Sequence, residues 1–112
     1  MIEKTIRDYL AQTLNVGVYT EVPEEFEESY VIVEKTGGRA ENHVSTNTFA
    51  IQSIGQSMYQ ASALNEAVKT AMKNIVELNT ISACRLQGDY NFTDTRTKQY
   101  RYQSVFSLVH FE

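Results

Sequence analysis

The last residues of the chain predict a β-strand with apolar side chains on both faces. Successive side chains of a strand point to opposite sides, and residues 102–111 supply strong strand formers to each side. One face carries Tyr102, Ser104, Phe106, Leu108 and His110, and the other carries Gln103, Val105, Ser107, Val109 and Phe111. Such a strand needs cover above and below. We therefore expect a helix, another subunit, or both to pack against it.

Two segments predict amphipathic helices. Ile2, Ile6, Leu10 and Leu14 recur at helical spacing, and Asn15 with Gly17 is expected to end this first helix. A second helix is predicted from the capping pair Ser57 and Gln60 to residues 79–80. Its apolar seam follows alternating spacings of three and four and consists of Ala61, Leu64, Val68, Ala71, Ile75 and Leu78.

The remaining segments predict strands and turns. Residues 16–20, 30–35, 45–54 and 81–87 are expected to be strands. Residues 36–43 are expected to form a turn or loop, in which Gly37 and Gly38 permit positive φ. Residues 88–94 are rich in turn formers and aromatics and predict an exposed loop. The order predicts a single α+β domain over residues 1–112, a mostly antiparallel sheet with two main helices on one face.

Composition limits the possible functions. The chain has 112 residues, a net charge of −4 and a pI near 5.2, which argues against a protein that binds nucleic-acid phosphates. Cys84 is the only cysteine, so no intrachain disulfide forms, and its apolar surroundings favour a small buried side chain. The sequence shows no signal peptide and no apolar run of membrane-spanning length. We therefore expect a soluble cytoplasmic protein.

We find no pattern of residues that predicts catalysis. His43 and His110 do not have metal-ligand spacing and are interpreted as surface or edge histidines. Residues 36–39 lack the lysine and glycine spacing of a phosphate loop. Asp89 and Asp94 are read as ordinary turn chemistry. The sequence thus predicts neither an enzyme nor a cofactor or metal site.

Two segments remain candidates for binding. Residues 21–28 contain five glutamates and the only proline, which predicts a solvated connection, with a binding patch as the alternative. Near the C-terminus, aromatic and basic residues alternate, namely Tyr90, Phe92, Arg96, Lys98, Tyr100, Arg101 and Tyr102. This alternation is compatible with single-stranded nucleic-acid stacking and with anchors of a protein interface. The acidic net charge favours the interface.

Over nearly its full length, the chain resembles the tail terminator proteins of long-tailed bacteriophages, the family of the phage lambda tail terminator and related tail-to-head joining proteins. The resemblance rests on the order of four segments: residues 30–38, residues 49–53 with the capped alanine-rich helix behind them, residues 88–94, and residues 101–109. These are patterns rather than invariant motifs. They are more specific to phage neck and tail proteins than to the terminator itself.

The resemblance implies a structural role in the virion tail or neck, after assembly in the host cytoplasm. Six identical subunits would form a ring on the head-proximal end of the tail tube, stop tube growth and receive the head. The partners would be other copies of the chain, the major tail tube protein and a head-completion or connector protein, with DNA only passing through and no membrane. The candidate contact residues lie in segments 37–43 and 88–101: Gly37, Gly38, Arg39, His43, Tyr90, Phe92, Arg96, Tyr100 and Arg101.

Two alternatives stay open on the sequence. One is another phage part, such as a head-completion, stopper or minor tail protein. The other belongs to a different class, a small enzyme or a nucleic-acid-binding domain that uses the tyrosine- and arginine-rich segment 89–102.

Overall fold

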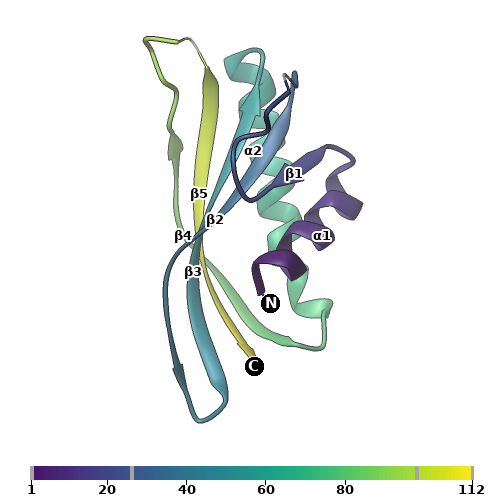
Figure 1. Ribbon diagram of the computed structural model, residues 1–112, viewed down its shortest axis with the longest axis vertical. Helices are drawn as coiled ribbons and strands as arrows, with labels where there is room; N and C mark the ends of the chain where they lie inside the picture. The colour runs from purple at the N-terminus through teal and green to yellow at the C-terminus, as the bar shows by residue number, and fades with distance from the viewer. Residues whose placement is uncertain (1, 26, 98, 112) are drawn as a thin grey trace.

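A five-stranded sheet with both α-helices on one face organises the chain (Figure 1). The structure is a computed structural model that describes residues 2–25, 27–97 and 99–111. Phe26 and Lys98, which belong to the two candidate binding segments, lie outside the described residues. The elements in chain order are α1 (Ile2–Leu14), β1 (Gly17–Tyr19), β2 (Tyr30–Glu41), β3 (Val44–Gly55), α2 (Met58–Lys73), the short 3-10 helix η1 (Ile75–Glu77), β4 (Ile81–Asn91) and β5 (Tyr100–Phe111).

The sheet is mostly antiparallel, as predicted. Its strand order is β1-β2-β3-β5-β4, and only β1 and β2 run parallel. Helix α2 carries the chain from β3 to β4, and the last strand then enters between them. The C-terminal strand is therefore central, and the α+β class predicted from the sequence is confirmed.

The first helix and the start of the second agree with the sequence prediction. Helix α1 ends at Leu14, and Asn15 follows with φ of 57°, a left-handed conformation typical of a helix end. At the start of α2 the Ser57 hydroxyl accepts a hydrogen bond from the Gln60 amide at 3.1 Å. The Gln60 side chain accepts from the Gln56 amide at 3.1 Å, one residue earlier than in the standard capping box.

The end of the second helix was predicted too far along the chain. Helix α2 ends at Lys73, and a separate 3-10 turn covers Ile75–Glu77. At Asn74 the side-chain amide donates to the Thr70 carbonyl at 3.1 Å. The backbone amide of Asn74 bonds to Ala71, three residues back, at 3.1 Å. This tightening ends the regular α-helical ladder.

The core lies between the helices and the inner face of the sheet. It is built from α1, α2, η1 and all five strands, and its fully buried side chains include Ile6, Leu10, Phe49, Ile51, Met72, Ile75 and Leu108. The Tyr9 hydroxyl of α1 donates to the Ala71 carbonyl of α2 at 2.7 Å, which ties the two helices together. Of the predicted seam, Leu64 and Leu78 are only partly buried.

The glycine pair was wrongly predicted as a turn. Strand β2 continues through Gly37 and Gly38 to Glu41, and neither glycine has positive φ. The turn consists of Asn42 and His43, with φ of 52° and 66°, the signature of a two-residue hairpin turn. Gly38 instead permits close approach, because a Cβ there would lie 1.8 Å from Asn47 Oδ1.

The second predicted loop is also largely strand. β4 continues through Gly88 to Asn91, with a register shift between Leu86 and Gly88. Pairing extends beyond the named strands, because the Asp94 amide donates to the Gln99 carbonyl at 3.2 Å. Residues 88–91 of the predicted loop are therefore largely exposed strand, and residues 92–97 and 99 complete the end of a long β4–β5 hairpin.

The two faces of the last strand differ in their cover. Ser104, Phe106, Leu108 and His110 are buried on the helix side. The alternate residues from Gln103 to Val109 are only partly buried, because nothing in the described chain packs over the middle of this outer face. The alternation was predicted correctly. The helices supply the expected cover on one face, and cover of the outer face by another subunit stays a prediction.

Gly55 provides a test of helix–sheet packing. A Cβ at Gly55 would lie 2.7 Å from the Ala61 backbone nitrogen, so Gly55→Ala forces α2 away from β3. We expect a loss of about 1–3 kcal/mol, the usual cost of overpacking. Gly37→Ala is the matched control, because its Cβ would meet nothing within 4 Å. Urea unfolding measures both, and equal midpoints for the two variants would contradict the close approach.

Candidate assembly surfaces

The candidate residues of the β4–β5 hairpin form one aromatic and basic cluster. The Tyr90 and Phe92 rings meet edge to face at a centroid distance of 6.1 Å. The Arg101 guanidinium lies 4.9 Å from the centroid of the Phe92 ring, and its Nε donates to the Phe92 carbonyl at 2.8 Å. Tyr90 and Phe92 remain 44% and 41% exposed. The chain thus holds two aromatic rings at its surface in a fixed arrangement.

Arg96 and Tyr100 lie beside this cluster in different environments. The Arg96 side chain is 91% exposed, with its Nε 3.9 Å from the Asp94 carboxylate. Tyr100 opens β5, pairs with Gly55 of β3 and is half-buried. Gln99 at the same end donates to the Tyr30 hydroxyl at 3.1 Å. Among the described residues of this hairpin, Arg96 is therefore the most exposed cation, whereas Tyr100 belongs mainly to the fold.

The second candidate group lies in the other hairpin. Gly37, Gly38 and Arg39 are exposed residues of β2, and His43 is exposed in its turn. The two hairpins lie at opposite ends of the molecule, whose longest dimension is 44 Å (Figure 1). The β2–β3 hairpin extends beyond the helices, whereas the end of the β4–β5 hairpin lies beside the start of α2, where Thr93 contacts Met58. The candidate residues of each hairpin therefore lie close together, and the two sets lie at opposite ends of the molecule.

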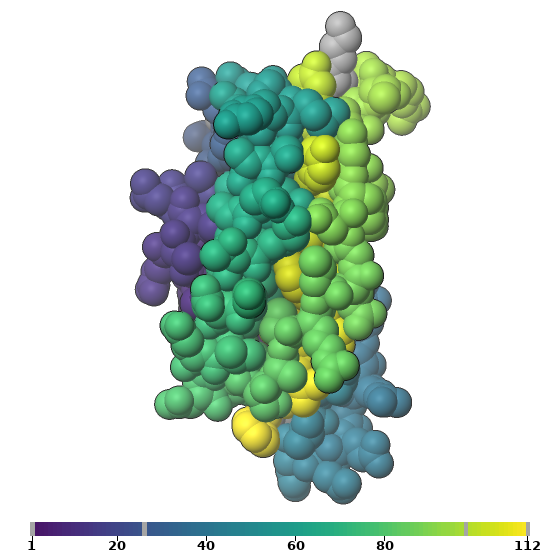
Figure 2. All heavy atoms as spheres, turned by 180° about the vertical axis from the view of Figure 1, so that it is seen from behind, coloured from purple at the N-terminus to yellow at the C-terminus, as the bar shows by residue number. Residues whose placement is uncertain are grey.

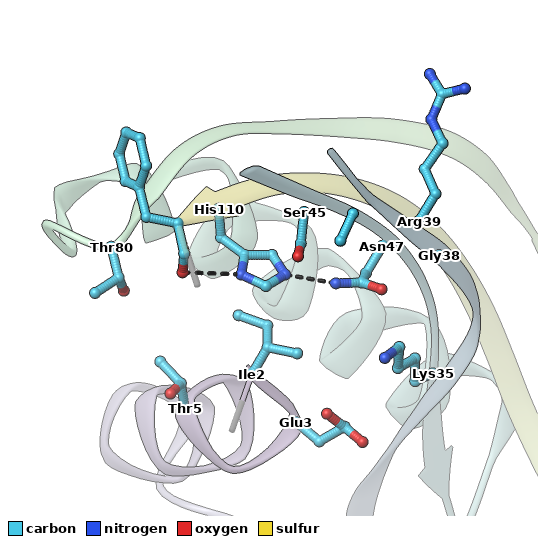
Figure 3. A pocket seen from close by; sticks show the side chains of 12 residues that line it. Ile2, Glu3, Thr5, Lys35, Gly38, Arg39, Ser45, Asn47, Thr80 and His110 are labelled. Atoms are coloured by element: carbon cyan, nitrogen blue, oxygen red, sulfur yellow. Dashed lines mark hydrogen bonds between the residues drawn. The ribbon is translucent and has the colours of Figure 1, made fainter. Parts of the chain in front are cut away.

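A polar pocket lies between α1 and the β2–β3 hairpin. It has a volume of about 610 Å³, and Ile2, Glu3 and Thr5 of α1 face Asn47 and His110 of the sheet across it (Figure 3). His110 is buried rather than at the surface or a sheet edge, because β5 is a central strand. The original interpretation of this histidine is therefore wrong, whereas His43 is exposed as predicted.

The buried polar residues of this pocket support one another. Asn47 Nδ2 contacts His110 Nε2, and His110 Nδ1 lies 3.4 Å from the Phe111 carbonyl. Both contacts are satisfied by the tautomer with its proton on Nδ1. The pair joins the base of the β2–β3 hairpin to the end of β5, and we assign it a structural role. No local pattern indicates this pairing, because the two residues are 63 positions apart in the sequence.

A charged network joins α2 to β4. Asp89 accepts hydrogen bonds from Asn65 Nδ2 at 2.7 Å and from Lys69 Nζ at 2.6 Å, and Lys69 also pairs with Glu66. Desolvation alone would raise the pKa of Asp89, but the hydrogen bonds from Lys69 and Asn65 outweigh it and lower that pKa. The hydrogen bonds that Lys69 makes to Asp89 and Glu66 raise the pKa of Lys69. The interpretation of Asp89 as a turn residue is therefore wrong.

This network predicts a pH-dependent contribution to stability. A lowered Asp89 pKa means that the folded state favours the carboxylate, so the contribution is present above the ordinary value of 3.8 and is lost as pH falls below it. We expect Asp89→Asn to cost about 1 kcal/mol at pH 7. The difference from the parent should shrink as the pH is lowered from 7 to below 3.8, where the carboxylate becomes protonated. Urea unfolding across this range tests it, and a difference independent of pH would contradict the ion pair.

Few other features of the described residues suggest a metal site, a membrane helix or a reactive side chain. Among them, no group of three or more His, Cys, Asp or Glu side chains is placed to hold a metal ion. No described helix is long and apolar enough to cross a membrane. Burial raises the pKa of the Cys84 thiol to about 11, and Cys84 packs against the core. This agrees with its interpretation as a small apolar side chain.

The fold is similar to that of a virion protein. A chain in the virion of a native gene transfer agent (GTA) particle superposes with a TM-score of 0.62 at 15% sequence identity. The match covers 92% of this chain and 84% of that chain. No family model and no curated protein matches the sequence. At this identity the comparison establishes a shared fold over almost the whole chain.

Proposed function

We propose that the protein is a structural component of a phage or prophage virion. The observation that carries this proposal is the fold shared with the gene transfer agent chain over nearly the full length of both proteins. The order of segments that resembles tail terminators supports it independently. The shape also fits, because an elongated sheet with a hairpin at each end offers separate contacts to different partners (Figure 1).

Within this class we propose the role of tail terminator. Copies of the chain would form a ring, with six subunits as the family resemblance implies, on the head-proximal end of the tail tube. The exposed hairpin residues would contact the tube, the connector or neighbouring copies. The net charge of −4 suits a lumen through which DNA passes, since like charges disfavour tight binding. This role needs neither catalysis nor a cofactor.

The nucleic-acid alternative has less support. Single-strand binding requires aromatic faces that are free for stacking, and Arg101 of the same chain already covers one face of the Phe92 ring. The Tyr90 hydroxyl is already bonded to Gln103. An assay with labelled single-stranded DNA at low salt should detect no binding, whereas salt-sensitive binding would favour this alternative.

Deletion of the gene tests the terminator role. In the phage that carries it, we expect overlong tails that lack heads, seen by electron microscopy, and restoration of normal tails by the gene in trans. Tails of normal length without heads would favour a connector or stopper. Normal particles would contradict a structural role.

A further inference from the structure

Both edges of the sheet have free backbone groups in the described chain. Strand β4 is terminal, with β5 as its only neighbour in the sheet. At the other edge β1 pairs with β2 only at residues 30–32, so the rest of β2, residues 33–41, has β3 as its only neighbour. A free strand edge presents backbone donors and acceptors to any chain that pairs with it. In Figure 2, β4 (green) forms one side of the molecule, and α1 (purple), which packs beside β1, lies on the opposite side.

The directions of these two strands permit a continuous sheet between copies. From β2 through β3 and β5 to β4, every pairing is antiparallel, so β2 and β4 run in opposite directions. When a second copy stands beside the first in the same orientation, as in a ring, its β2 therefore runs antiparallel to β4 of the first copy. Such a junction joins two different edges, which is the heterologous type of contact that closes rings.

An acidic depression lies beside the free edge of β2, between α1 and the segment that follows β1. It has a volume of about 1020 Å³. It begins where β1 ends, at Tyr19 opposite Ile32 of β2, because the chain then leaves the sheet. Among the described residues that line it, six are glutamates and three are lysine or arginine. Two of these cations, Lys4 and Arg7, already pair with Asp8. The depression therefore favours a strand with positive charge.

The regular part of the β4 edge carries one positive charge. Register shifts on both sides leave residues 83–86 as an unbroken stretch of pairing with β5, and Arg85 is its only charged residue. Arg85 is exposed on the sheet face away from the helices, because it alternates with Leu86, whose partner Phe106 belongs to the core. Leu86 itself is 50% exposed on the helix side. The stretch thus offers one cation and one uncovered apolar side chain.

The regular free part of β2 offers the complementary charge. A register shift follows Lys35, so residues 33–35 are the regular part of the free edge, and they also line the depression. Val33 is buried in the helix-side core, which turns Glu34 to the other face, where it is exposed. Among the ion pairs of the described residues, none includes Glu34 or Arg85. Both charges are therefore available to a second chain.

We propose that β4 of one copy pairs antiparallel with residues 33–35 of β2 in the next copy, with Arg85 opposite Glu34, an inference that rests on the proposed ring. In this register Leu86 lies opposite Val33 and Cys84 opposite Lys35, so each pair joins residues of the same sheet face. Opposite charges across such a junction stabilise it, and Leu86 gains cover. The ends of the two hairpins then stay free for the tube and the connector.

Charge exchange tests the junction. Glu34→Arg and Arg85→Glu should each raise the concentration for half-assembly by about tenfold, because like charges then face each other. The two substitutions in one chain should restore assembly. Glu41→Arg is the matched control, since Glu41 is another exposed glutamate of the free β2 edge and the change in net charge is the same; it should assemble like the parent. Mass photometry and analytical ultracentrifugation, alone and on purified tail tubes, measure assembly, and circular dichroism confirms folding.

A crosslink tests the register without relying on charge. Opposite residues of antiparallel strands have Cβ atoms about 4.5–5.5 Å apart, close enough for a disulfide after a small adjustment. In a Cys84→Ala background, Glu34→Cys with Arg85→Cys should therefore give a ladder of disulfide-linked oligomers on a non-reducing gel after oxidation. Glu41→Cys with Arg85→Cys in the same background is the control and should give no ladder.

The outcomes separate this inference from the proposed function. Restored assembly in the exchanged variant, together with the ladder from Glu34→Cys and Arg85→Cys, supports the junction. If the parent assembles and the single reversals assemble equally well, or if the ladder forms through Glu41→Cys instead, the junction is wrong and the ring stands. If the parent fails to oligomerise both alone and on tail tubes, both the ring and the junction are overturned.

Discussion

Ile75→Ala is expected to destabilise the protein by about 2–5 kcal/mol, the usual cost of truncating a fully buried isoleucine. Ile75 has no exposed surface and packs in the main core from the 3-10 turn after α2. Because domains of this kind are stable by only about 5–15 kcal/mol, the variant could lose most of its folded population on warming.

Leu64→Ala is the matched comparison on the same seam. The sequence predicts equal burial for both residues, but Leu64 is only partly buried. We therefore expect Leu64→Ala to cost less than Ile75→Ala, about 1–2 kcal/mol. Urea unfolding with unchanged slope measures both. Equal losses would mean that the helix is rotated relative to the structure, and no loss at Ile75 would place the 3-10 turn outside the core.

Local patterns were sufficient to predict most of the fold. The spacing from Ile2 to Leu14 predicts α1 in full, and the alternation of residues 102–111 predicts which side chains of β5 share a face. Both signals depend on the period of the element and on burial of one face. Whether the outer face of β5 is covered depends on what packs over the sheet, and the pattern of one strand does not specify that.

The wrong predictions of turns arose at glycines, because glycine is found both in turns and at special positions within strands. Gly37, Gly38 and Gly88 are typical of turns, yet each lies within a strand. Gly38 makes room for Asn47, and Gly88 follows a register shift in β4. The actual turn at Asn42 and His43 needs positive φ at two residues. Asparagine tolerates this conformation well, so position 42 was a usable signal.

At the candidate sites, contacts between residues far apart in the sequence could not be predicted. Exposed aromatics at Tyr90 and Phe92 were predictable from the sequence, and the structure confirms their exposure. Their packing with Arg101, and the bond between Lys69 and Asp89 across 20 positions, depend on how the hairpin and helix pack. A single sequence does not reveal such pairs, because each partner considered alone is an ordinary surface residue.

The aromatic cluster of the β4–β5 hairpin carries the second large prediction. Tyr90→Ala with Phe92→Ala should leave the chain folded, since both rings are partly exposed and an edge-to-face contact such as theirs is worth only about 0.5–1.5 kcal/mol beyond its buried area. Under the proposed terminator role, assembly with the tail tube should weaken by about a hundredfold or more, because a few aromatic anchors supply most of an interface's energy. Complementation of the gene deletion, followed by electron microscopy of the tails, measures the effect.

Charge reversal at this hairpin requires a choice between two arginines. Arg101 bonds to the Phe92 carbonyl and covers its ring, so its reversal would disturb the hairpin itself. Arg96 is almost fully exposed and lies 3.9 Å from Asp94, so Arg96→Glu changes the surface and leaves the fold intact.

Tyr59→Ala, which removes an exposed aromatic on α2, is the control. If the hairpin contacts the tube, the Tyr90 and Phe92 double variant and Arg96→Glu should give overlong tails while Tyr59→Ala gives normal ones. Normal tails with all three variants would exclude this hairpin from the interface, even if deletion of the gene confirmed the terminator role.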